Sequence, residues 1–134
     1  MKSMIFLMTM SVLAILIVPI IHDAFAIQGN ASSTLKNGTW ETKVNKQVQI
    51  TSDVTNNQDK TQSFAYLVQI QNHDEVVVSL SWLTGSLDPG QSLNPSQSWT
   101  PTSPGNYTAQ IFVWNSLNDP DPLSTPLNMM ITVT

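Results

Sequence analysis

The chain has 134 residues and a formal net charge of −4, because nine carboxylates outnumber five lysines and there is no arginine. This balance argues against nucleic acid and anionic lipid head groups as partners, since proteins that bind phosphates need clustered Lys and Arg. The absence of cysteine excludes disulfides, cysteine nucleophiles and thiolate metal ligands. We therefore expect packing and sheet hydrogen bonds to stabilise the fold.

The first segment has the order of parts of a secretory signal. Lys2 precedes an apolar run from Met4 to Ile21, and Ala24-Phe25-Ala26 has the A-x-A pattern of a cleavage site. We expect residues 1–26 to be a signal peptide, with a hydrophobic helix over the apolar run, that is cleaved after Ala26. The alternative is an uncleaved N-terminal anchor, because about 18 apolar residues reach the lower limit for spanning a bilayer.

In both cases the remainder is expected to be exported to the extracellular space or the cell surface. It would contact a membrane only through residues 1–21, and only if they are not removed.

Residues 27–38 are small and polar without a period, which predicts a flexible leader. No repeat of about 20–50 residues is visible. We therefore expect residues 39–134 to form one domain.

The dominant period after residue 46 is two, which is typical of half-buried strands. Each expected strand has one face that is predicted to point into the core. These faces are Val48, Ile50 and Val54; Phe64, Tyr66, Val68 and Ile70; Val76, Val78, Leu80 and Trp82; Tyr107, Ala109, Ile111 and Val113; and Leu127, Met129, Ile131 and Val133. Trp82 and Tyr107 are thus predicted to be core residues.

Turn chemistry separates these stretches. Clusters of Asn, Asp, Pro and Gly occur at 56–59, 72–74, 88–90, 101–105 and 119–126. Short strands with such turns between them predict an all-β protein, namely an antiparallel Ig-like or fibronectin-III-like β-sandwich of about seven strands. Tyr107 follows the turn Pro104-Gly105-Asn106 and is a candidate corner tyrosine, whose hydroxyl bonds to the backbone.

The order of five short stretches carries a resemblance to known exported domains. They are FAYLVQI at 64–70, VVVSLSW at 76–82, LDPGQS at 87–92, SWTP at 98–101 and PGNYTAQIFVW at 104–114. Residues 46–134 resemble CARDB-type and fibronectin-III-like adhesion modules, above all secreted sandwich domains of ammonia-oxidising archaea. They are also similar, more weakly, to proteinase-inhibitor domains of the BsuPI type. Neither resemblance implies a catalytic residue, and a shared fold does not fix function.

Catalysis and metal binding find little support in the sequence. His73 is the only histidine after the signal, and it lies in the polar stretch QNHDE without a nucleophile elbow such as GxSxG. Asn118, Asp119 and Asp121 offer oxygen atoms that suit calcium, but calcium usually needs six or more oxygen ligands. The prolines around them explain the segment as a stiff connection. We therefore predict no enzyme activity, no cofactor and no metal.

Three sequons make Asn30, Asn37 and Asn106 candidate glycosylation sites. Chance predicts about as many sequons for this content of Asn, Ser and Thr. Glycosylation is therefore compatible with export but is not indicated by the count.

The outward-facing aromatic side chains are a stronger functional signal than the histidine, the acidic loop or the sequons. Phe112 and Trp114 lie on the face that Thr108 and Gln110 mark as solvent-facing, and Leu67 interrupts the outer face of another strand. If these strands are neighbours, the three residues form an apolar outer patch, which is uncommon on a monomer. The alternative is that the N-terminal part around Trp40 covers the patch.

The preferred function is a non-enzymatic structural or adhesion module of the cell envelope, with other envelope or extracellular proteins as partners. The alternative is a proteinase-inhibitor-like or glycan-binding module. An inhibitor would use loops at 84–95 or 100–105. A glycan-binding module would stack Trp40, Trp99 or Trp114 on sugar rings.

Overall fold

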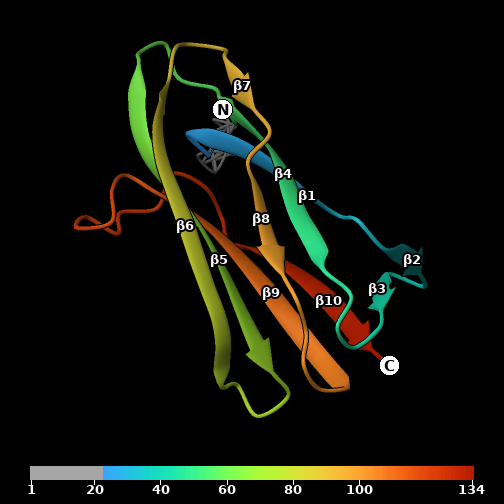
Figure 1. The fold of residues 1–134 in the computed structure, drawn as a ribbon. Helices are drawn as coiled ribbons and strands as arrows, with labels where there is room; N and C mark the ends of the chain where they lie inside the picture. Colours follow the sequence, from blue (N-terminus) through green and yellow to red (C-terminus); the bar gives the residue numbers. More distant parts are fainter. Residues whose placement is uncertain (1–22) are drawn as a thin grey trace, which may run out of the picture.

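The computed structural model describes residues 23–134, and the predicted signal helix over residues 4–21 lies outside them. Ten strands form two sheets that pack face to face (Figure 1). The strands are β1 (Phe25–Ala31), β2 (Thr34–Lys36), β3 (Thr39–Thr42), β4 (Val48–Asn56), β5 (Gln62–Asn72), β6 (Val77–Leu87), β7 (Ser92–Leu93), β8 (Ser96–Trp99), β9 (Gly105–Trp114) and β10 (Leu127–Val133). The predicted all-β sandwich is thereby confirmed for the described residues.

The two sheets differ in size. The large sheet has the order β2-β3-β10-β9-β5-β6, and all its neighbours are antiparallel except β3 and β10. The small sheet has the order β1-β4-β7, and β8 also pairs with β4. β6 therefore forms one edge of the large sheet, and the three-residue β2 forms the other (Figure 1).

The core lies between the sheets and is made by the predicted faces of four strands. Ile50 of β4, Tyr66 of β5, Ile111 of β9 and Ile131 of β10 each have an exposed fraction of 0%. The polar residues that alternate with them, such as Gln49 and Asp53 on β4, are exposed. A period of two thus correctly predicts which face of these strands is buried.

The predicted inner face of β6 is wrong. Trp82 is 53% exposed and Leu80 is 50% exposed, whereas Leu83 packs against the core. The register of β5 and β6 shifts between Ile70 and Gln71, which is a β-bulge. Because Ser79 and Ser81 alternate with Leu80 and Trp82, alternation predicts that the large apolar side chains point inward, whereas in the structure the serines lie on the inner side.

The predicted leader over residues 27–38 is also not a leader in the structure. Its residues belong to β1, which pairs with β4 from Phe25↔Asn56 to Ala31↔Ile50, and to β2. A Cβ atom on Gly29 would lie 2.6 Å from Leu127 Cδ2, so β1 passes close to β10 here and a larger residue would displace the side chains of Leu127 and Met129. Edge strands are held by backbone pairing and need no strong apolar period.

Two polar side chains fix the ends of the sandwich. The buried Asn56 donates from Nδ2 to the carbonyl oxygens of Lys60 and Leu87, at 2.9 and 3.0 Å, and so ties the end of β4 to the end of β6. The Tyr107 hydroxyl donates to the Ser103 carbonyl oxygen at 2.8 Å. The predicted corner tyrosine is thereby confirmed.

Tyr66 links the two sheets inside the core. Its hydroxyl lies 2.8 Å from the Ser52 hydroxyl of β4, and burial raises the pKa of Tyr66 above its ordinary value near 10, against the lowering effect of that hydrogen bond. The unfolded chain therefore loses this proton at a lower pH than the folded chain does.

We expect the ionisation of Tyr66 to leave the free energy of unfolding unchanged below about pH 10 and to lower it as the pH rises from about 10 towards the higher folded-state pKa. Tyr66→Phe should remove this contribution and cost about 1 kcal/mol at neutral pH, because Ser52 loses its partner. Urea unfolding between about pH 8 and pH 11 measures both effects. An identical pH dependence in the variant would contradict the assignment.

Candidate functional site

The three residues predicted to form an outer patch are brought together on the large sheet. Leu67 of β5 is paired with Phe112 of β9 on one side and with Trp82 of β6 on the other. Trp114 is the partner of Ala65 in the same register. The side chains of Leu67, Phe112 and Trp82 therefore form one row across three strands, because paired residues point to the same face of a sheet.

This row is the floor of a groove of about 390 Å³ on the outer surface of the large sheet. We call it the outer apolar groove, and its lining residues are Leu67, Gln69, Leu80, Trp82, Phe112, Trp114 and Leu117. Leu67 is buried at the floor, Phe112 and Trp114 are half-buried, and Leu80 and Trp82 are exposed. The aromatic rings of Phe112 and Trp114 contact each other with centroids 5.6 Å apart.

The outer apolar groove carries no ionisable side chain among its lining residues. Its one polar member, Gln69, donates from Nε2 to Gln110 Oε1 at 3.0 Å and so already has a partner. A surface of this kind has no group for acid–base chemistry or for holding an ion. It can bury apolar area and stack flat rings.

The sequence interpretation missed Leu80 and Trp82 as groove residues. The available signal was Ser79 and Ser81, which alternate with them and are only partly exposed. Ser79 and Ser81 lie on the inner side of β6, which also contacts β8 of the small sheet, and Leu80 and Trp82 point outward.

The other candidate aromatics lie elsewhere. Trp99 is buried and its ring contacts the Tyr107 ring edge-on at 4.9 Å between centroids. Trp40 is partly buried against the core on β3. Of the tryptophans predicted to stack on sugars, Trp114 thus lies in the groove and the other two support the fold.

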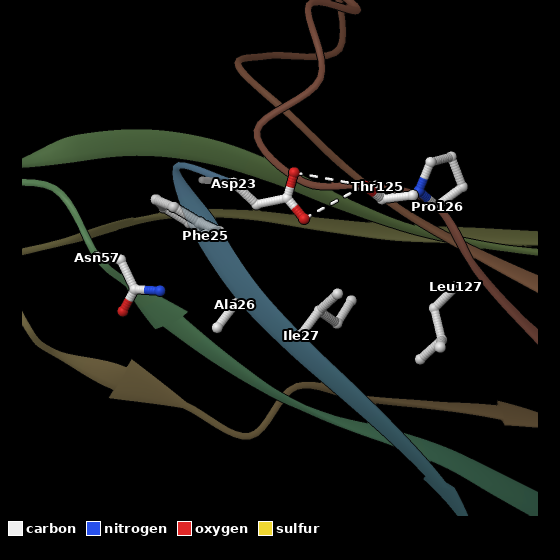
Figure 2. Close-up of a pocket in the computed structure, with 8 residues that line it drawn as sticks. All are labelled: Asp23, Phe25, Ala26, Ile27, Asn57, Thr125, Pro126 and Leu127. Carbon is white, nitrogen blue, oxygen red and sulfur yellow. Dashed lines mark hydrogen bonds between the residues drawn. The ribbon is translucent and has the colours of Figure 1, made fainter. Parts of the chain in front are cut away.

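A second hollow, of about 480 Å³, lies beside β1 (Figure 2). Ile27 and Leu127 line it with Asn57, and the Asp23 carboxylate accepts a hydrogen bond from the Thr125 hydroxyl at its rim. It is more polar than the outer apolar groove and is formed largely by the first residues of the described chain.

The remaining predicted residues stay apart from both hollows. His73 is 72% exposed, and its Nε2 lies 3.3 Å from Asp74 Oδ1. Asn30, Asn37 and Asn106 are all exposed, as glycosylation would require. Among residues 23–134 there is no group of three or more His, Asp or Glu side chains arranged to hold a metal ion.

The prolines and acids of residues 115–126 form an internally bonded loop. Asn115 Nδ2 donates to Asp119 Oδ2 at 2.8 Å, and the Asp119 amide donates to Ser116 Oγ at 2.9 Å. One of the two loops considered for an inhibitor, over residues 84–95, contains strand β7 and is followed by strand β8. Both strands pair with β4. No helix within residues 23–134 is long and apolar enough to cross a membrane.

Solved structures with a similar fold support the sandwich. The CARDB domain of a Pyrococcus furiosus protein, crystallised in complex with di-metal ions, is 19% identical, covers 82% of this chain and 87% of its own, and has a TM-score of 0.61. A β-glucosidase of Erythrobacter marinus is 12% identical over 82% of this chain and 15% of its own, with a TM-score of 0.60. A PapD-like domain of human CEP192 is 12% identical over 91% and 94%, with a TM-score of 0.51.

At these identities the structural neighbours show the fold alone, and they confirm the CARDB-like, Ig-like resemblance. No curated protein sequence matches the chain significantly. A family model described as S-layer A-like matches residues 12–133, which is nearly the whole chain. The protein therefore belongs to the S-layer A-like family and is a cell-surface β-sandwich module.

Proposed function

We propose that this protein is a structural module of the cell envelope that binds a neighbouring protein module through the outer apolar groove. The observation that carries the proposal is the exposure of Leu80 and Trp82 beside a floor of buried Leu67. The solvent-facing side of a sheet normally carries polar side chains, whereas this one carries aromatic side chains on two strands. Family membership supports the location at the cell surface.

The partner surface should be uncharged and apolar. The groove offers no charge to pair with, and a carboxylate or ammonium group placed there would lose water without gaining a partner. Protein contacts of this kind gain most of their affinity from a few aromatic residues at the centre of the interface. Trp82 is the best placed of them, because it is half exposed before binding.

Glycan binding is the second candidate, and one observation favours it. Trp82 and Trp114 line the same groove, so two indole rings face one open surface. Sugar rings stack on exposed aromatic faces, which this surface offers. The groove has few polar side chains to bond the sugar hydroxyls, however, and this favours a protein partner.

We expect Trp82→Ser to reduce the amount of protein retained in the envelope fraction about tenfold or more, the change that the loss of an aromatic anchor of about 1.4 kcal/mol or more produces. Met130→Ser is the matched control, because Met130 is 51% exposed on β10 of the same sheet but does not line the groove. Both variants should keep the melting temperature nearly unchanged, since both side chains are exposed. Equal retention of the two variants would contradict the proposal.

The same variants separate the two candidates. Titration of the protein with soluble oligosaccharides, followed by tryptophan fluorescence, should show no saturable change if the partner is a protein. A saturable change that Trp82→Ser abolishes and Met130→Ser preserves would favour glycan binding instead.

A further inference from the structure

The edge of the large sheet beside the groove is unusually open. β6 has 11 residues and no strand on its outer side within the described part of the chain (Figure 1). Residues 76–87 contain no charged residue and no proline, and Val77, Val78, Leu80 and Trp82 are each about half exposed. Proteins usually protect such an edge with lysine, proline, a β-bulge or a very short strand, and of these β6 has only the bulge beside Val77.

The opposite edge of the same sheet is protected. β2 has three residues, ends in Lys36 and is followed by Asn37 and Gly38, both with positive φ. The contrast within one sheet indicates that β6 is left open because it is covered in the functional state.

We propose that β6 pairs with β6 of a second copy of this chain, in an antiparallel two-fold arrangement centred on Ser81. This inference rests on the proposed function and names the partner as the same protein. In this register Leu80 of each copy faces Trp82 of the other on the outer side of the sheet. Ser81 faces Ser81, and Ser79 faces Leu83, on the inner side.

The strand is complementary to itself in both polarity and charge. Apolar side chains meet apolar ones on the outer side, and no charged residue lies between 76 and 87, so two copies place no like charges opposite each other. The bulge beside Val77 ends the regular part of β6 at Ser79. The proposed pairing between the two copies therefore extends regularly from Ser79 to Leu83. The pairing would satisfy outward backbone groups of β6 and join the two outer apolar grooves side by side.

Because the chain has no cysteine, single-cysteine variants test this geometry directly. Residues opposite each other in an antiparallel pair have Cα atoms about 4.5–5.5 Å apart, which is within the range that a disulfide bridges. Ser81→Cys in the full-length protein on intact cells should therefore give a cross-linked dimer under mild oxidation. Asn128→Cys, at an exposed position on β10, is the matched control and should stay monomeric.

Adding Leu80→Lys to Ser81→Cys should lower the cross-linked fraction about tenfold, because an edge lysine blocks strand addition. Adding Met130→Lys should not change it, and unchanged far-ultraviolet circular dichroism shows that both variants fold. Failure of Ser81→Cys to cross-link, or equal cross-linking of Ser81→Cys and Asn128→Cys, would overturn the two-fold pair. Envelope retention that still depends on Trp82 would then leave the proposed function standing with another protein as partner.

A second inference comes from the start of the described chain. Phe25 has an exposed fraction of 0%, and its ring contacts Phe64 of β5 with centroids 5.7 Å apart. The Phe25 amide donates to the Leu123 carbonyl oxygen at 2.8 Å, and the Asn57 amide donates to the Ala24 carbonyl oxygen at 3.0 Å. Figure 2 shows the Asp23 carboxylate directed at Thr125, which closes this corner of the sandwich.

We infer that Asp23–Ala26 belongs to the mature fold, so that any cut that removes the apolar N-terminal segment falls before Asp23. A cut after Ala26 would remove a fully buried ring and the three contacts around it. In the structure Phe25 and Ala26 are the first two residues of β1, and Ala24 precedes the strand. The small-large-small pattern of these three residues also fits a cleavage site.

Phe25→Ala separates the two roles, because it keeps small residues at positions 24 and 26 and so leaves the cleavage pattern intact. We expect the melting temperature of the exported protein to fall by at least about 10 °C, since a buried phenylalanine is lost. Intact-mass measurement of the native protein should give an N-terminus at Asp23 or earlier. A native N-terminus beyond Asp23, or an unchanged melting temperature in Phe25→Ala, would overturn the inference.

Discussion

Burial of β5 on both faces is the constraint on which the rest of the large sheet depends. Five consecutive residues, Phe64 to Val68, are buried, although adjacent residues of a strand point to opposite sides. The inner side faces the small sheet. The outer side has no second layer of strands within residues 23–134, so the side chains of the neighbouring strands β6 and β9 must cover Ala65 and Leu67.

The outer apolar groove follows from this requirement. Phe112 and Trp114 of β9 flank β5 on one side, and Trp82 of β6 flanks it on the other. The groove of about 390 Å³ lies between them. Ala65 and Leu67 of β5 are buried in this way, but the side chains of Leu80 and Trp82 on β6 stay about half exposed, uncharged and next to an open edge. A single partner strand with its outward side chains would both extend the sheet and complete this cover.

Hydrogen bonds of buried polar side chains connect the two sheets and the ends of strands, a role that disulfides have in many exported domains of this size. Asn56 donates to carbonyl groups near the ends of two other segments, and its own Oδ1 accepts from the Gln58 amide at 2.9 Å. Tyr66 and Ser52 join the two sheets through one buried hydrogen bond. The side chains of Asn56, Tyr66 and Ser52 are themselves buried, so the loss of a partner would leave a buried polar group without that hydrogen bond.

Sequence patterns predicted the strands in which apolar and polar residues alternate cleanly. Val48, Ile50 and Val54 sit between Gln49, Thr51 and Asp53, and this contrast fixes the buried side of β4. Phe112 and Trp114 were identified as outward for the same reason, and Leu67 was correctly joined to them.

The same patterns fail on the edge strands. On β6 the side with Leu80 and Trp82 faces outward and the side with Ser79 and Ser81 faces inward, so alternation predicts the facing the wrong way round and places Trp82 in the core. β1 and β2 are polar edge strands held by backbone hydrogen bonds to β4 and β3, and backbone pairing leaves little trace in side-chain composition. Gly29 marks the close approach of β1 to β10, but a lone glycine in a polar stretch also fits a flexible segment.

The two edges of the large sheet together limit what the proposed pairing can build. A two-fold contact uses β6 of both copies at once, so the joined sheet ends on each side in a β2 edge. Each β2 edge is three residues long and carries Lys36, and such an edge resists further strand addition. Sheet extension would thus stop at a pair instead of growing into a fibre. Any larger surface assembly would have to use faces other than the sheet edges, and the two outer apolar grooves, brought side by side, would form one uncharged face for such a contact.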